Sequence, residues 1–221
     1  MKTSLFRMTI SLAILGLAGC NTLTGDALDT LRLAYSGPQP TVTAEQVQAA
    51  NRPVLLVEFG VADAMLVSPS QAASSGEPVE WHGITEMLLT QGGRLVQTAG
   101  LPADIIAPLQ NNDPFLLGLH TLADGTRITR LVDYPARYLT GLHQHAHYRI
   151  GRLEPIRFMG REHQLLRIDE HIRMPELGFK ATNHYWIEAD TGLVRYSVQH
   201  LAPDLPPLHL TLARTRGVAQ P

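Results

Sequence analysis

Apolar and polar residues alternate in short runs along most of the chain, and such runs predict β-strands rather than helices. In the first half, Pro53–Phe59 and Ala64–Val67 flank a turn at residues 60–63 and predict a hairpin. Trp81–Thr90 and Arg94–Ala99, joined through Gly92 and Gly93, predict a second hairpin. We expect residues 100–114 to form a loop with a short helical turn.

The second half continues this pattern. The expected strands are Thr126–Tyr134, Ala146–Ile150, Pro155–Met159, Gln164–Ile172, Asn183–Glu188, Leu193–His200 and Pro207–Ala213. Asp190–Gly192 predicts a hairpin turn between two of them. No helical pattern of 10 to 15 residues separates these runs, which disfavours parallel βαβ units. The pattern predicts one β-rich domain of antiparallel strands with a few short peripheral helices.

Helical spacing is found near the amino terminus. Ala27, Leu28, Leu31 and Tyr35 recur as on one face of a short helix, and Thr43 with Gln46 forms a predicted capping box that opens a second helix ending before Pro53. Residues 20–52 are therefore expected to be a helical segment preceding the strands.

The first nineteen residues predict a secretory signal. Met1–Arg7 carries two positive charges, and Met8–Ala18 is an apolar stretch of eleven residues. That stretch would rise only about 16 Å as a helix, too little to span a membrane. Leu17-Ala18-Gly19-Cys20 resembles the bacterial lipobox, in which the cysteine becomes the first, lipidated residue of the mature chain. Cys20 is the only cysteine, so the mature domain, residues 20–221, is expected to lack disulfides.

Acyl chains such as palmitate on Cys20 would hold the protein at a membrane, because each buried methylene contributes about 0.8 kcal/mol. Asn21 is not acidic, and in bacterial lipoproteins such a residue resembles the outer-membrane sorting signal. We therefore expect the protein to be anchored at the periplasmic face of the outer membrane.

Composition and charge limit the classes of partner that the protein is expected to bind. The chain is 44% hydrophobic and 17% charged, which excludes a disordered protein. The net charge of −2 becomes more negative once Lys2 and Arg7 are removed, so a nucleic-acid partner is not expected. Lys180 is the only lysine after the signal. Arginine would suit uronic-acid sugars or lipid headgroups, but the arginines are spread from Arg32 to Arg216 without a run, which favours a genomic bias.

Several segments together resemble the group 4 capsule polysaccharide lipoprotein family (YjbF/GfcB-like). They are the lipobox, Gly93–Thr98 leading into Gly100-Leu101-Pro102 with Asp104, Asp113-Pro114, and Asn183–Trp186 to Gln199 with Pro203. The resemblance implies an antiparallel sheet curved into a half-barrel or sandwich, and an outer-membrane lipoprotein acting beside periplasmic proteins and an outer-membrane β-barrel in exopolysaccharide export. It implies no established catalysis. One departure is Met174-Pro175, where a cysteine was expected.

Three histidines form the most conspicuous cluster. His143, His145 and His147 alternate and would share one face of a strand. Their outer Cα atoms would lie about 13.6 Å apart, so at most two could share a metal ion. A solvated strand face is the favoured interpretation, with His163, His171 or His184 as conceivable further ligands. No cofactor is expected.

Motifs of catalysis are missing: the sequence has no Gly-x-Ser-x-Gly, His-Glu-x-x-His or phosphate-binding glycine loop, and we assign no catalytic residue. Asp169 and Glu170 are adjacent and would face opposite sides of a strand, so they cannot form a catalytic pair, although the inward one could meet an arginine. Tyr185 and Trp186 are candidate sugar-stacking residues, of which one must point inward.

The leading hypothesis is a non-catalytic accessory lipoprotein of exopolysaccharide or capsule assembly that contacts a polysaccharide or a secretion partner. A first alternative is a half-barrel carrier for a lipid or other hydrophobic ligand, which requires an unfilled apolar cavity. A second is a metal-dependent or glycoside-cleaving enzyme, which requires carboxylates or histidines converging in one cleft.

Overall fold

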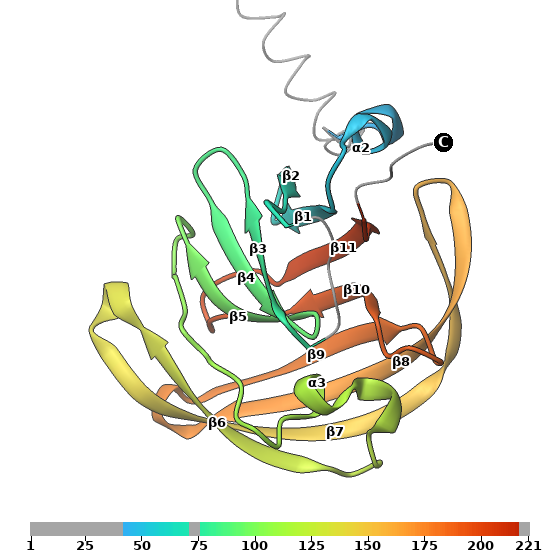
Figure 1. Ribbon diagram of the computed structural model, residues 1–221. Coiled ribbons are helices and arrows are strands. Elements are labelled where there is room, and N and C mark those ends of the chain that lie inside the picture. The colour runs from blue at the N-terminus through green and yellow to red at the C-terminus, as the bar shows by residue number, and fades with distance from the viewer. Residues whose placement is uncertain (1–41, 71–75, 217–221) are drawn as a thin grey trace, which may run out of the picture. The chain divides into compact units, whose positions relative to one another are not determined.

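One antiparallel sheet of eleven strands dominates the computed structural model, which describes residues 42–70 and 76–216 (Figure 1). The strand order is β5-β4-β3-β2-β1-β11-β10-β9-β8-β7-β6. The strands are β1 (Val54–Phe59), β2 (Ala62–Val67), β3 (Pro78–His82), β4 (Met87–Gln91), β5 (Arg94–Ala99), β6 (Arg127–Tyr134), β7 (Leu139–Phe158), β8 (Arg161–Met174), β9 (Phe179–Ile187), β10 (Val194–Gln199) and β11 (Leu208–Arg214).

The sheet curls into a half-barrel whose inner side holds the hydrophobic core (Figure 1). Its two edge strands, β5 and β6, are linked by Ile106, which forms isolated bridges to Gln97 and to Asp133. The Ile106 amide donates to the Asp133 carbonyl at 3.0 Å, and the Ala107 amide donates to Val96 at 2.7 Å. A short loop segment therefore pairs with both edges at one level of the sheet.

The expected mainly β fold class, with a half-barrel and short peripheral helices, is confirmed. The hairpin at Asp190–Gly192 is also confirmed, since β9 and β10 pair across it. The first expected helix, around Asp26–Tyr35, and the expected lipidation site Cys20 lie outside the described residues.

Two helices are short. α2 (Ala44–Ala49) begins at the predicted capping box, in which Thr43 Oγ1 accepts from the Gln46 amide and the Gln46 side chain accepts from the Thr43 amide. α3 (Pro114–Leu117) supplies the expected helical turn: Asp113 caps it by accepting from the Phe115 amide at 3.1 Å, and Pro114 occupies the first turn, where no amide donor is needed. Among the described residues no helix has the length and apolar character to cross a membrane.

Two strand expectations were wrong. Trp81–Thr90 is divided into β3 and β4 by a turn in which the Gly83 amide donates to the Glu86 carbonyl. Ala146–Ile150 and Pro155–Met159 are not separate strands, because the twenty-residue strand β7 runs from Leu139 to Phe158. Gly151 and Pro155 do not end that strand, because β6 pairs with β7 only as far as His147, and proline is tolerated on a strand edge without a neighbour.

The turn between β4 and β5 is packed against the interior, which explains its two glycines. Gly92 and Gly93 have φ values of 60° and 88°. A Cβ on Gly92 would lie 2.3 Å from the Phe115 carbonyl oxygen, and one on Gly93 would lie 2.4 Å from Val194 Cβ. Only glycine satisfies both the conformation and the space.

Two hairpins of the half-barrel share one design. β6 and β8 each lead through a proline into a single 3-10 turn, η2 (Pro135–Arg137) and η3 (Pro175–Leu177). A left-handed residue then ends the turn just before the next strand: Tyr138 with φ 55° in the first hairpin and Gly178 with φ 60° in the second. Tyr138 is almost fully exposed and therefore gains little packing in return for its strained backbone.

Candidate functional site

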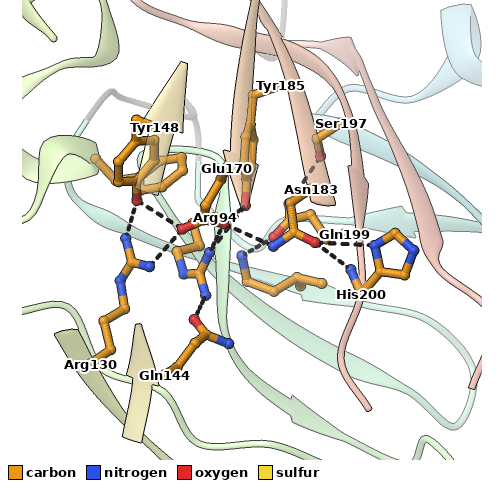
Figure 2. Close-up of polar contacts among 12 residues, drawn as sticks. Arg94, Arg130, Gln144, Tyr148, Glu170, Asn183, Tyr185, Ser197, Gln199 and His200 are labelled. Atoms are coloured by element: carbon orange, nitrogen blue, oxygen red, sulfur yellow. Dashed lines mark hydrogen bonds and ion pairs between the residues drawn. The ribbon is translucent and has the colours of Figure 1, made fainter. Parts of the chain in front are cut away.

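Four charged side chains form a buried cluster inside the half-barrel: Arg94, Asp113, Arg130 and Glu170 (Figure 2 shows its centre). They come from β5, the cap of α3, β6 and β8, and none is more than 4% exposed. Burying a charge is costly unless it is paired and hydrogen-bonded. The contacts of each member therefore decide what the cluster can do.

Arg130 is bound on two sides. Its Nε lies 2.6 Å from Asp113 Oδ2 and its Nη2 lies 3.0 Å from Asp113 Oδ1, a bidentate pair. Its Nη1 lies 2.6 Å from Glu170 Oε1, and Nη2 also donates to the Tyr148 hydroxyl. One guanidinium thus joins the cap of α3 to the sheet through charge-assisted hydrogen bonds.

Glu170 lies between two arginines. Arg94 Nη1 is 2.5 Å from Glu170 Oε2, and Asn183 Nδ2 donates to the same oxygen at 2.8 Å. Burial alone would raise the pKa of Glu170, but the positive charges of Arg94 and Arg130 outweigh burial and lower that pKa to about 2. The carboxylate therefore stays ionised at any physiological pH.

The two tyrosines of the cluster are donors to this carboxylate. Tyr148 donates to Glu170 Oε1 at 2.8 Å and Tyr185 to Oε2 at 3.1 Å. Burial, followed by the negative charge of Glu170, raises the pKa of both hydroxyls, so neither is an available base. The Phe115 ring of α3 packs edge-on against both tyrosine rings.

A polar chain continues from the cluster to β10 and the following loop (Figure 2). Asn183 Oδ1 accepts from the His200 amide at 2.8 Å. Gln199 accepts from the Leu95 amide and donates to the Gly93 carbonyl, both at 2.9 Å. Gln199 thus ties β5 to β10, and Asn183 ties β9 to the residue that follows β10.

The charges and hydrogen bonds of the cluster are almost fully satisfied from within. Two arginines balance two carboxylates, and among the four charged side chains only Arg94 leaves a buried polar atom, Nε, without a hydrogen-bond partner. Glu170 and Asp113 are both held by Arg130, so neither is poised to exchange a proton with a substrate.

The apolar hollow beside the cluster is small. It has a volume of about 40 Å³ and is lined by residues of β1, β3, β4, β10 and β11, including Leu55, Val79, Trp81, Leu210 and Leu212. Pockets for organic ligands measure about 300–1,000 Å³. The hollow has room for a water or two but not for an acyl chain.

The predicted histidines lie on the outer face of β7, as their alternation required. His143 pairs with Glu176 at 2.9 Å, and His145 Nδ1 contacts Thr129 Oγ1 at 3.0 Å. His147 faces His171, with ring centroids 6.1 Å apart. No group of three metal-ligating side chains converges within residues 42–70 and 76–216.

The structure separates the two aromatic candidates. Tyr185 is fully buried in the cluster and has no ring face at the surface. Trp186 points the other way, 9% exposed, and donates to Glu154 at 2.8 Å while Arg167 lies over its ring. Asp169 and Glu170 likewise face opposite sides of β8. Asp169 pairs with Arg167 outside, and Glu170 meets arginines inside, as the sequence analysis allowed for the inward residue.

Sequence reasoning missed Arg94, Asp113, Arg130 and Gln144, whose Oε1 accepts from Arg94 Nη2 at 2.6 Å, as members of one cluster. Their contacts across the cluster join residues 17 to 91 positions apart, and no local pattern reports such pairs. One signal was available: Asp113 before Pro114 is a typical start of a helix. It predicts the cap but not the ion pair with Arg130.

Comparison with known proteins shows which family this half-barrel belongs to. The sequence profile of a family described as "Group 4 capsule polysaccharide lipoprotein gfcB, YjbF" matches residues 25–212. The chain belongs to this family, as the lipobox and the motifs around Asp113 and Asn183 had indicated.

A similar sequence is the uncharacterized lipoprotein GfcB of Escherichia coli (strain K12), 22% identical over 210 residues, which cover 94% of this chain and 97% of the relative. A similar structure is the crystal structure of the hypothetical lipoprotein YmcC from Escherichia coli (K12), with a TM-score of 0.67 and 22% identity over 84% of this chain and 94% of that one. At this identity the structural likeness shows a shared fold.

Proposed function

We propose that this chain is a non-catalytic accessory lipoprotein of capsule or exopolysaccharide assembly or export, held by acyl chains on Cys20 at the periplasmic face of the outer membrane. Membership of a capsule polysaccharide lipoprotein family supports the assignment to this process. The signal at residues 1–19, the lipobox and Asn21 support the location.

The single observation that carries the non-catalytic part is the filled interior. A carrier or an enzyme on this fold would use the concave side of the sheet, yet that side is occupied by apolar side chains and by the balanced cluster around Glu170. A molecule with a packed interior acts through its surfaces. The proposed partners are a polysaccharide, an outer-membrane β-barrel exporter and other export proteins.

The filled interior also weighs against both alternatives. A lipid carrier needs a cavity several times larger than the hollow of about 40 Å³. A glycoside hydrolase needs two carboxylates flanking an open substrate position. Asp113 and Glu170 instead share one buried guanidinium.

Crosslinking in the native envelope tests the proposal. A photo-reactive amino acid at Tyr138 or Val61, which are 94% and 84% exposed, would report neighbours without disturbing the core. We expect capture of an export protein or of the polysaccharide. Capture of lipid alone, from a position facing the interior such as Leu55, would contradict the proposal and favour the carrier.

The anchor has its own test. Replacing Cys20 by serine prevents acylation, so the protein is expected to leave the membrane fraction. Asn21→Asp is the matched control for sorting, since it keeps the lipid and changes only the residue that follows it. A Cys20→Ser protein that still sediments with membranes would refute lipid anchoring.

A further inference from the structure

The outer face of β6 and β8 carries two arginines, Arg127 and Arg173, that form no ion pair with an acid in the described part of the chain. Strand pairing sets Arg127 opposite His147 and His147 opposite His171. One level along, Thr129 is opposite His145, His145 is opposite Arg173, and Arg173 is opposite Lys180 of β9. We call these residues the imidazole-arginine surface: Arg127, Thr129, His145, His147, His171, Arg173 and Lys180.

The neighbouring levels of the sheet differ in one respect: their acids are paired. On one side Asp124 lies 3.1 Å from Arg149, and Asp169 lies 2.7 Å from both Arg167 and His184. On the other side Glu176 pairs with His143. Within the part of the chain that the structure describes, Arg127, Arg173 and Lys180 form no ion pair within 4.0 Å.

Like charges opposite each other on paired strands destabilise a sheet. Arg173 faces Lys180 on one side and an imidazole on the other, so this arrangement of exposed cations costs stability. An anion between the cations would offset that cost. Arginine is suited to a carboxylate because its planar guanidinium binds both oxygens.

The surface is also hollowed. A groove of about 760 Å³ is lined by Arg127, Arg173, His145, His147 and His171, together with Gln110 and Asn112 of the loop before α3. Amides and imidazoles suit sugar hydroxyls, since each can donate and accept hydrogen bonds. Arg127 and Arg173 belong to strands two apart in the sheet, with backbones separated by at least about 10 Å, so the two guanidiniums can bind separate carboxylates of one polymer.

From this arrangement we infer that the imidazole-arginine surface binds an acidic polysaccharide that carries carboxylates on successive sugars. The inference deepens the proposed function by naming the chemistry of its polysaccharide, and it rests on that function. A flat anionic membrane is the poorer match, because Arg152 and Arg157 on the β7 overhang are 88% and 75% exposed and would reach a flat surface more readily than a recessed groove.

Binding is expected to be strongest in acid. His147 is faced by Arg127 from β6, Arg149 from its own strand, His171 from β8 and Asp124 from the preceding loop. Loss of hydration, and then the charges of Arg127 and Arg149, lower the pKa of His147, whereas Asp124 opposes them. A bound carboxylate would raise this pKa, so protonation and binding strengthen each other.

Affinity measurements with polygalacturonate, a polymer of uronic acid, test the inference on the purified lipidated protein in a neutral detergent. Arg127→Gln/Arg173→Gln removes two charges from the groove. Arg152→Gln/Arg157→Gln is the matched control, because it removes two exposed arginine charges from β7, outside the groove. The groove variant is expected to bind about tenfold more weakly, about 1.4 kcal/mol, and the control within about twofold of the unchanged protein.

Three results would overturn the inference: no binding of polygalacturonate, equal weakening by both double variants, or binding of neutral dextran with the same affinity. Retention on phosphatidylglycerol vesicles through Arg127 and Arg173, without affinity for the polyuronate, would also overturn it in favour of a membrane surface. Nuclear magnetic resonance titration should show the His147 pKa rising when polygalacturonate is added, and an unchanged value counts against the groove.

A measurement in cells separates this inference from the proposed function. If deletion of the protein reduces surface polysaccharide and Arg127→Gln/Arg173→Gln does so as well, both stand. If deletion has the effect but the double variant exports normally, the groove inference fails while the proposed function remains. If deletion changes nothing at the cell surface, the proposed function itself fails, even where the purified protein binds polygalacturonate.

Discussion

Arg130 and Glu170 form a buried ion pair across a strand that separates them. Arg130 belongs to β6 and Glu170 to β8, with β7 between them in the sheet, yet Arg130 Nη1 lies 2.6 Å from Glu170 Oε1. The same guanidinium binds Asp113 at the start of α3. One side chain therefore fixes both the curvature of the sheet and the position of the helix inside it.

Arg130→Met should destabilise the fold by about 3–5 kcal/mol, because two buried carboxylates lose their cation. The measurement is the midpoint of urea unfolding. Arg149→Met is the control: Arg149 and Asp124 form an exposed pair, which contributes about 0–1 kcal/mol. Similar losses in the two variants would mean that the cluster does not hold the half-barrel together.

Stability should fall in acid. Glu170 has a folded pKa of about 2 against an ordinary value of 4.5, so the unfolded chain takes up a proton that the folded chain resists. The resulting stabilisation, roughly 3 kcal/mol, is present above pH 4.5 and is lost as the pH falls toward 2.

Unfolding of the unchanged protein and of Glu170→Gln, compared between pH 6 and pH 2.5, checks this acid dependence. The glutamine variant is less stable at pH 6, and its stability should depend less on pH below about 4.5. Equal acid dependence in both proteins would show that other carboxyl groups dominate.

Substitutions at the left-handed residues of the two proline hairpins should change the stability of the fold in opposite directions. Gly178→Ala should cost about 1 kcal/mol, although its Cβ would meet open space, because a left-handed backbone disfavours any side chain. Tyr138→Gly should stabilise the fold by about 0.5–1 kcal/mol, because the strained tyrosine is exposed. Thermal unfolding measures both. A destabilised Tyr138→Gly protein would show that this side chain has contacts beyond those described.

Ile106→Pro should open the link between the edge strands. Proline has no amide to donate to the Asp133 carbonyl, which removes one of the hydrogen bonds that join the loop to β6. We expect a loss of about 1–3 kcal/mol and faster hydrogen exchange at Asp133 and Ala107. Ile106→Val, which keeps the amide, is the control, and it should preserve slow exchange at both positions.

Local patterns were enough to predict most of the fold. Alternating residues located the strands, Thr43 and Gln46 located α2, and Asp190–Gly192 located a turn, because each signal lies within a few residues. The length of β7 was not predictable in this way. Gly151 and Pro155 ordinarily end strands, and whether they do depends on a neighbouring strand that the local sequence does not reveal.

In the candidate sites, too, local sequence predicted which way a side chain points but not which residues it meets. Alternation placed the histidines on one outer face and turned Glu170 away from Asp169. Their partners come from elsewhere in the chain: Glu170 meets Arg94 across 76 positions. Strand register brings Arg127 and Arg173, far apart in the sequence, to one outer face, whereas Arg94 and Arg130 lie in the interior.

Pro155 stands on the part of β7 that extends past β6, where the strand pairs only with β8. An unpaired strand edge can hydrogen-bond to the backbone of another molecule, which is how many β-proteins polymerise. Proline interrupts such pairing because it has no amide hydrogen to donate. This part of β7 can thus expose Arg152 and Arg157 to solvent without promoting edge-to-edge aggregation of the protein.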